Sequence, residues 1–229
     1  MIRKANVEDW ESISSISARA GYDDYINMEF GRSYLDGHDV YVHISQEIDG
    51  FIKLEPLDDK SLWFSGLRVD PESRRKRIGT KLLKFALDHA INNGYKSLRC
   101  MVETNNIPSI RLMESFGLSV VDKYFFFSGG IDISDFEKSY SYSGNYANKE
   151  WKFDSAHETV YSQGNRQVYL HTGRMLYYTV LSGDEFKYTD EGSTCAPESI
   201  APFIKLQPDY GFKSGYIFEM ETSHRPDNL

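Results

Sequence analysis

Over its first 127 residues the sequence changes repeatedly between the two hydrophobic periods that distinguish helices from strands. Apolar residues recur every three or four positions in residues 10–19 and 78–91, as they do on one face of a helix. They alternate or run together in residues 40–44, 51–54 and 62–69, as they do in strands. Because both kinds of element are interleaved, the sequence predicts a mixed α/β fold built on one sheet.

The predicted order is strand, two helices, three strands, helix, strand, helix and strand. These elements are expected at residues 2–5, 10–19, 23–35, 40–44, 51–54, 62–69, 78–91, 98–102, 106–116 and 120–127. Asn6 is expected to cap the first helix. Turns at Asp49-Gly50 and at residues 58–60 would join the three middle strands as an antiparallel meander. Gly129-Gly130 is expected to interrupt the last strand, so the strand that completes the sheet should come from later in the chain.

The sequence changes character after Phe127, where ten of the sixteen tyrosines lie. Short apolar runs separated by turn residues predict strands, at residues 151–153, 167–170, 175–180 and 216–220. We therefore expect two parts, residues 1–128 and a β-rich extension over residues 129–229.

Charge and composition limit the classes of partner. The formal net charge of −8 argues against binding nucleic acid through phosphate neutralisation and favours a cationic or amine partner. Cys100 and Cys195 lie far apart without metal-ligand spacing, so we expect two free thiols in the cytoplasm and no metal site. No apolar stretch is long enough to cross a bilayer, and the first residues do not resemble a secretory signal.

The most informative segment for function is residues 67–80, where a strand, a short loop and an amphipathic helix follow one another. Four cationic residues, Arg74 to Arg77, occupy the turn before the helix, and Gly79 would let backbone approach a ligand closely. The unpaired N–H groups and the dipole of a helix N-terminus attract anions. This pattern favours a phosphate site, although a basic run can also be a solvated surface patch, a nuclear-import signal or a DNA-binding segment.

This segment resembles the acyl-CoA loop of the GCN5-related N-acetyltransferase (GNAT) family, whose pattern is Arg or Gln, two residues, Gly, one residue, then Gly or Ala. Arg74 and Gly79 take the first and last places, and Arg77 replaces the middle glycine. Residues 106–118 resemble the family's second motif, a helix that opens on Asn. The resemblance extends over residues 2–127 and implies a GNAT acyl-CoA N-acyltransferase fold.

The resemblance also implies that acetyl-CoA is the cosubstrate and an amine the acceptor. Backbone groups of Leu67 and Val69 would bind pantetheine as an added strand, and Asn106 and Ser109 would line the pantetheine arm. The pyrophosphate would be held by the loop and first helical turn, comprising Arg74, Arg75, Lys76, Arg77, Ile78, Gly79 and Thr80. Asn106 can equally act as a plain helix N-cap, and the two roles are compatible.

The catalytic groups are harder to assign. Many family members have a Tyr on the helix of the second motif that acts as the general acid. This chain has Met113 at that position, and a thioether cannot donate a proton. Tyr124 is a candidate acid, although it can also be a packed aromatic residue. Glu103 and Glu55 are equal candidates to deprotonate the amine through water. Glu103 could instead pair with Arg99 or cap the next helix, and Glu55 could be a solvated charge.

Three functions remain open from the sequence. The first is an acetyl-CoA-dependent N-acetyltransferase acting on a primary amine of a small molecule or a protein. The second is a catalytically weak or inactive acyl-CoA-binding regulator, and the third is a β-rich C-terminal binding module with the first half as scaffold. The acceptor is not fixed by the fold, and a homodimer is one of the assemblies left open.

Overall fold

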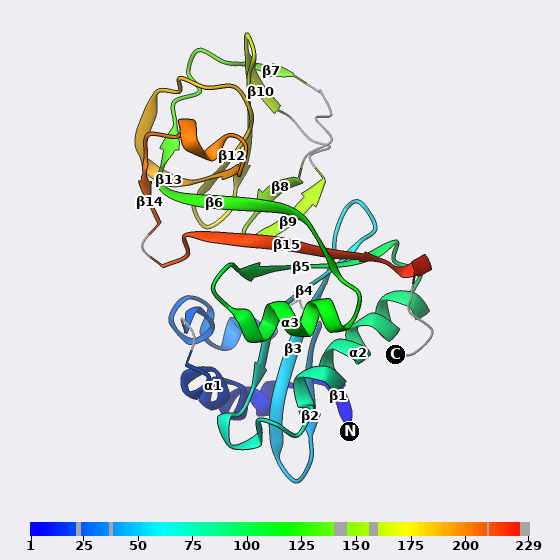
Figure 1. The fold of residues 1–229 in the computed structure, drawn as a ribbon. Coiled ribbons are helices and arrows are strands. Elements are labelled where there is room, and N and C mark those ends of the chain that lie inside the picture. Colours follow the sequence, from blue (N-terminus) through cyan, green and yellow to red (C-terminus); the bar gives the residue numbers. More distant parts are fainter. Residues whose placement is uncertain (22–23, 37–38, 140–145, 156–159, 210, 225–229) are drawn as a thin grey trace. The chain divides into compact units, whose positions relative to one another are not determined.

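The computed structural model describes residues 1–21, 24–36, 39–139, 146–155, 160–209 and 211–224 (Figure 1). The chain divides into two compact units, each assembled from separate stretches of sequence. The first unit comprises Met1–Arg99, Leu112–Gly117 and Met220–Leu229, and the second comprises Cys100–Arg111 and Leu118–Glu219.

The first unit is a sheet with helices on both faces. Its elements are β1 (Ile2–Lys4), a 3-10 turn (Val7–Asp9), α1 (Trp10–Arg19), β2 (Asp39–Ile44), β3 (Ile48–Pro56), β4 (Leu62–Val69), a 3-10 turn (Pro71–Ser73), α2 (Ile78–Asn92), the start of β5 (Ser97–Glu103) and a 3-10 turn (Thr222–His224). Strands β1 to β4 pair antiparallel in chain order, and β4 pairs with β5 in parallel. The predicted meander is therefore confirmed.

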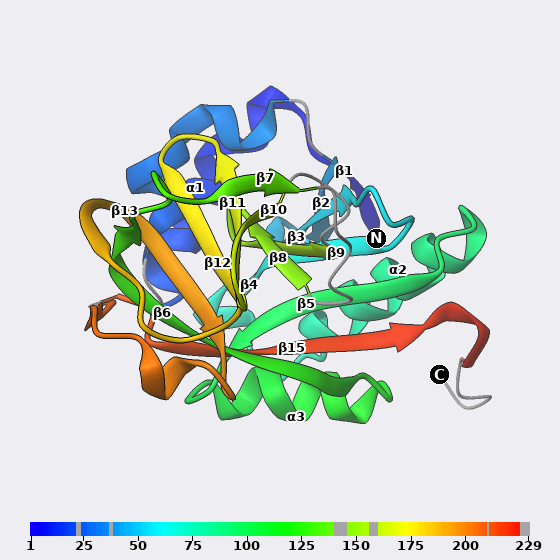
Figure 2. The same ribbon diagram turned by 90° about the horizontal axis from the view of Figure 1, so that it is seen from above.

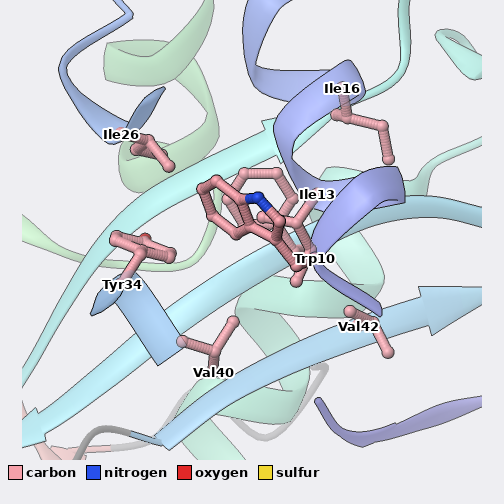
Figure 3. Packing of buried hydrophobic residues seen from close by; sticks show 8 residues of the cluster. Trp10, Ile13, Ile16, Ile26, Tyr34, Val40 and Val42 are labelled. Atoms are coloured by element: carbon pink, nitrogen blue, oxygen red, sulfur yellow. The ribbon is translucent and has the colours of Figure 1, made fainter. Parts of the chain in front are cut away.

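The core of the first unit lies between the sheet and α1 (Figure 3). It consists of Trp10, Ile13, Ile16, Ile26, Tyr34, Val40, Val42 and Phe51. Because side chains alternate along a strand, Tyr41 points to the opposite face, where its ring centroid lies 4.6 Å from that of Phe85 in α2. Helices α1 and α2 therefore cover opposite faces of this sheet (Figure 2).

The helical stretch expected over residues 23–35 is confirmed from residue 26 to residue 35, where it consists of two short helices of different types. Ile26–Phe30 forms a π-helical turn and Gly31–Leu35 a 3-10 helix, while residue 23 lies outside the described residues. Gly31 has a φ of 55°, a left-handed conformation that glycine adopts readily and that ends the first turn. The break lets Ile26 and Tyr34 both reach the core.

The expected turn at Asp49-Gly50 is also wrong, because both residues lie inside β3. The connection to β2 runs through residues 45–47 instead. Asp49 binds Nδ1 of His43 at 2.5 Å and accepts from the hydroxyl of Ser45 at 2.6 Å. Gly50 is required by packing, since a Cβ there would lie 2.9 Å from the side chain of Ile78.

The second unit is rich in strands, as expected. Its elements are the end of β5, the start of α3 (Ile107–Ser115), β6 (Ser119–Ile131), β7 (Glu137–Ser139), β8 (Tyr146–Lys149), β9 (Lys152–Ser155), β10 (Val160–Gln163), β11 (Arg166–Thr172), β12 (Leu176–Ser182), β13 (Tyr188–Pro197), a 3-10 turn (Ala201–Phe203), β14 (Gln207–Pro208) and β15 (Ser214–Glu221). Strands β13, β12, β11, β10 and β7 follow β6 in that order, and β8 and β9 form a separate hairpin.

Strand β6 is paired on both edges. One edge pairs with β15 and β14, and the other with β13. The strand expected from residues 216–220 is thus β15, which confirms that the partner of β6 comes from the end of the chain.

The expected interruption at Gly129-Gly130 is wrong, since β6 continues through both residues. These glycines let β13 approach closely. A Cβ on Gly130 would lie 2.4 Å from the carbonyl oxygen of Glu191, and Gly129 has a φ of 108°. The glycines therefore adapt the strand to a register shift in β13 rather than ending it.

Both cysteines are buried free thiols, and burial raises the pKa of Cys195 to about 12. Within the described ranges, no helix has the length and apolar character needed to cross a membrane. The same residues contain no group of three or more metal-binding side chains.

Candidate functional site

Strand β4 has an open edge and a bulge. It pairs with β3 along its length, but Gly66 and Leu67 together oppose Ile52, which makes a β-bulge. On its other edge it pairs with β5 only at Leu62 and Trp63. Within the described part of the first unit, the backbone beyond Trp63 has no strand partner on this edge. Its N–H and C=O groups can therefore bind an extended ligand as an added strand.

The basic loop leads from the end of β4 into α2. Arg74, Arg75, Lys76 and Arg77 are all exposed. Arg75 and Arg77 have φ values of 65° and 59°, so two residues of this turn are left-handed. Alternation of left-handed and other conformations turns successive N–H groups toward one point, as in anion-binding nests.

Helix α2 begins after Arg77, as expected. Its first intrahelical bond runs from the N–H of Lys81 to the carbonyl of Arg77 at 3.0 Å. The N–H groups of Ile78, Gly79 and Thr80 therefore have no acceptor within the helix. Arg77 provides no side-chain cap, and the first turn contains no acidic residue. The positive end of the helix dipole thus lies beside four cations, an arrangement that a bound anion would stabilise.

Three contacts hold this loop in place. Arg74 donates to the carbonyl oxygen of Ala20 at 2.7 Å, which ties the loop to the end of α1. Arg19 pairs with Asp70 at 2.5 Å. Asp70 also accepts from the N–H of Glu72 at 3.1 Å. The guanidinium of Arg74, the first arginine of the motif, is therefore hydrogen-bonded within the protein. Arg75 and Arg77 instead extend from left-handed backbone.

The donor set of this loop fits a pyrophosphate. It offers free helix N–H groups and cationic side chains, which are the groups that bind phosphate oxygens in proteins. A Cβ on Gly79 would lie 3.6–3.8 Å from Leu112, Leu67 and Val69, which is ordinary contact. Position 79 therefore has room for glycine or alanine, which are the two residues in the family pattern, but little room for a larger side chain.

A buried polar cluster lies on the α1 face of β3 and β4. Lys53 and Glu55 are buried, and Lys53 Nζ lies 3.4 Å from Glu55 Oε2. The ammonium of Lys53 also lies 5.1 Å from the ring centroid of Tyr34 and 5.6 Å from that of Phe30. Glu55 is thus a buried, paired carboxylate rather than the solvated charge considered from the sequence.

Two tyrosine hydroxyls converge on the bulge. A Cβ built on Gly66 would lie 2.1 Å from the hydroxyl oxygen of Tyr34 and 3.5 Å from that of Tyr25. Position 66 requires glycine for two reasons. Its φ of 60° is a left-handed conformation, and the Tyr34 hydroxyl leaves no room for a Cβ. Burial raises the pKa of Tyr25, and it raises the pKa of Tyr34 well above its ordinary value.

The remaining predicted site residues are in the second unit. Asn106 Oδ1 accepts from the N–H of Ser109 at 3.3 Å, so Asn106 does cap α3. Glu103 ends β5, and its carbonyl accepts from the N–H of Asn106 at 2.9 Å. Arg99, the partner considered for Glu103, forms an ion pair with Asp59 in the first unit at 3.0 Å. The proposed pantetheine and base roles of these residues stay predictions.

Tyr124 and Met113 are both buried. The hydroxyl of Tyr124 donates to the carbonyl oxygen of Tyr146 at 2.9 Å, and its ring centroid lies 4.5 Å from that of Phe153. Burial, followed by the charge of Asp122, raises the pKa of Tyr124 well above its ordinary value. Tyr124 therefore has the environment of a packed aromatic residue, and its role as an acid stays a prediction.

Sequence analysis did not single out Tyr34, Tyr25 or Gly66. The isolated glycine within the apolar run 62–69 is the one available signal, because such a glycine often marks a bulge. The tyrosines lie more than thirty residues away in an irregular segment, so no local pattern indicates that they reach β4.

Comparison with known proteins agrees with this geometry. The model of the acetyltransferase (GNAT) family matches residues 3–118, just over half of the 229-residue chain. No curated protein matches the sequence.

Several solved structures are similar. A proposed acetyltransferase from Thermoplasma acidophilum has a TM-score of 0.70 and 22% identity, covering 96% of this chain and 99% of that one. The ribosomal-protein-S18-alanine N-acetyltransferase from Escherichia coli has a TM-score of 0.51 and 13% identity, covering 100% and 97%. The PaiA N-acetyltransferase from Thermoplasma acidophilum, solved in complex with coenzyme A, has a TM-score of 0.49 and 20% identity, covering 53% and 91%. At these identities the likeness concerns the fold alone.

Proposed function

Because the chain belongs to the GNAT family of acetyl-CoA-dependent acetyltransferases, we propose that it transfers the acetyl group to a primary amine by direct attack of the amine on the thioester. The acceptor can be a small molecule or the amine of a protein or peptide. No covalent enzyme intermediate is needed, because the two substrates react while both are bound.

The observation that carries this proposal is the open edge of β4 leading directly into the basic start of α2. An acyl-CoA molecule has the same order of parts, an extended pantetheine arm joined to a pyrophosphate. In this proposal the backbone of Leu67 and Val69 binds the arm, and N–H groups from Arg75 to Thr80 bind the pyrophosphate. Arg74, Arg75, Lys76 and Arg77 supply the positive charge. Asn106 and Ser109 are predicted to contact the arm as well.

The amine must be neutral to attack, so a base is required near the thioester. Glu55 and Glu103 both remain candidates to accept this proton through water. Glu55 is supported by its burial beside Lys53 on the face that also carries Tyr34. Loss of the acidic limb of the pH–rate profile, the fall in rate at low pH, in E55Q or E103Q would identify which carboxylate serves.

Calorimetric titration with CoA tests the binding part of the proposal. Arg75→Glu reverses a charge in the loop, and we expect CoA to bind about 10- to 100-fold more weakly, in line with the loss of charged hydrogen bonds. Lys60→Glu is the matched control, because Lys60 is also exposed and left-handed, with a φ of 68°.

Both variants change the net charge equally, so a general electrostatic effect would weaken CoA binding in both. Selective loss in Arg75→Glu supports the assigned loop. Equal affinities in the wild-type protein and both variants would contradict it.

A further inference from the structure

The hydroxyl of Tyr34 is an unusual group in the first unit. The Tyr34 side chain is only 1% exposed, and its hydroxyl has no hydrogen-bond partner among the described residues. Buried polar groups in folded proteins are nearly always paired, so an unpaired one calls for an explanation. Its ring packs edge-on to Phe51, with centroids 6.3 Å apart, so the hydroxyl has a fixed position.

That position is the bulge of β4. The point that a Cβ of Gly66 would occupy lies 2.1 Å from the hydroxyl oxygen, so the oxygen fills the space that glycine leaves. Any larger residue at 66 would displace it. The hydroxyl and the bulge are therefore matched to one another.

The order of the pyrophosphate, pantetheine arm and thioester in acyl-CoA indicates which ligand group lies beside Gly66. With the pyrophosphate on the start of α2 and the pantetheine arm along Val69 and Leu67, the arm runs back toward the start of β4. The next residue in that direction is Gly66. The thioester, at the far end of the arm, is thus expected beside Gly66, and this step rests on the proposed function.

We propose that the Tyr34 hydroxyl donates its proton to the sulfur that leaves when the acetyl group is transferred. The amine nitrogen forms a bond to the acetyl carbon, the carbon–sulfur bond breaks, and the sulfur takes the bonding electron pair. Tyr34 gives that sulfur a proton, so the products are an N-acetylated amine and the CoA thiol. The proton lost from the amine nitrogen returns Tyr34 to its neutral form through solvent.

The surroundings keep Tyr34 protonated until that moment. Burial raises its pKa well above the ordinary value, and the nearby phenol of Tyr25 and carboxylate of Glu55 act in the same direction. The charge of Arg68 opposes them. The ammonium of Lys53 lies over the ring of Tyr34. Met113, at the position where many relatives carry a tyrosine, cannot perform this step because a thioether has no proton to donate.

The test compares Tyr34→Phe with Tyr41→Phe. Tyr41 is the control because it lies in the same sheet but packs against α2 on the opposite face. The first measurement is the ionisation of the thiol of bound CoA, followed by thiolate absorbance against the complex with desulfo-CoA. In the wild-type protein and Y41F, a hydrogen bond from Tyr34 stabilises the thiolate. In Y34F the bound thiol should ionise about one pH unit higher.

The second measurement is turnover. With CoA affinity unchanged, kcat of Y34F should fall by roughly 100-fold or more, as expected for loss of a general acid. Its melting temperature should equal or exceed that of the wild-type protein, because an unpaired hydroxyl has been removed.

The possible results distinguish the role of Tyr34 from the proposed function. An unchanged thiol ionisation in Y34F, with CoA still bound, would overturn the role of Tyr34 and leave the proposed function intact. A Y34F protein that does not fold would also overturn it, because the hydroxyl would then have a structural partner. Failure of all three proteins to bind CoA would overturn the proposed function and this inference together.

Discussion

At the scale of single residues, the loop and the strand that precedes it depend on backbone conformations that most residues avoid. Arg75, Arg77 and Gly66 all have φ values near 60°. A non-glycine residue in the left-handed region costs on the order of 1 kcal/mol, so Arg77 is held there at a cost. In the proposed function, this conformation directs N–H groups and the guanidinium of Arg77 toward the pyrophosphate. Glycine, which the family pattern has here, would give the backbone conformation without the charge.

Arg77→Gly should therefore separate stability from binding. We expect the unfolding free energy to rise by roughly 0.5–1 kcal/mol, because glycine adopts this conformation without strain and one cation is removed from the helix N-terminus. CoA should bind a few-fold more weakly through loss of the charge. Arg77→Ala is the control, since it removes the charge but keeps the Cβ. Chemical denaturation and calorimetry would measure both effects, and a less stable R77G than R77A would contradict this explanation.

At the scale of elements, a buried ion pair supports the connection between β4 and β5. Arg99 in β5 is 3% exposed in its side chain and pairs with Asp59 in the turn before β4. It also donates to the hydroxyl of Ser61 at 3.1 Å. Burial by itself would raise the pKa of Asp59, but the charge of Arg99 and hydrogen bonds from Ser61 outweigh it. The net effect lowers the pKa of Asp59.

A lowered pKa in the folded state makes this pair sensitive to acid. The stabilisation is present above the unfolded pKa, near 4, and is lost as the pH falls toward the lower folded value. Asp59→Asn should cost about 3 kcal/mol at neutral pH, since it leaves a buried guanidinium without its carboxylate. The difference from the wild-type protein should shrink below about pH 4.

Urea unfolding between neutral and acidic pH measures this effect. Asp58→Asn, in the same turn but exposed, should change stability by less than about 0.5 kcal/mol. Equal stability of D59N and D58N at neutral pH would show that the pair contributes nothing.

Elements with a local signal were predictable from the sequence. Helix α2 has a clear helical period and ends at Asn92, just before the turn with Gly94 at a φ of 73°. The basic loop was recognisable because its residues are contiguous. Glycines were the main source of error: Gly50 serves packing on Ile78, and Gly130 serves the approach of β13, although both resemble turn signals. The position of Tyr34 over Gly66 depends on a contact between distant segments, which no local pattern contains.

At the scale of the whole molecule, the sequence order does not follow the compact units. Strand β6 pairs with β15 on one edge and β13 on the other, and both partners come from the last third of the chain. The division into a GNAT domain over residues 1–128 and a β-rich extension over residues 129–229 stays a prediction. It does not imply that the two parts fold separately.

Truncation tests this interdependence. A protein ending at residue 128 loses both partners of β6, so its edges and apolar side chains, including Phe126 and Phe127, would be exposed. We expect this fragment to aggregate on expression, because open strand edges pair with other chains. The full-length chain expressed in parallel is the control. A soluble fragment with cooperative thermal unfolding would contradict the prediction.

The most direct test of the central claim is release of the CoA thiol from acetyl-CoA, measured with and without a panel of primary amines. Acetyl transfer predicts thiol release that depends on an added amine, with a matching increase of one acetyl group in the mass of that amine. Binding of acetyl-CoA without amine-dependent release from any member of a panel spanning small amines, polyamines and peptide N-termini would contradict the claim. That result would favour an acyl-CoA-binding regulator in place of an enzyme.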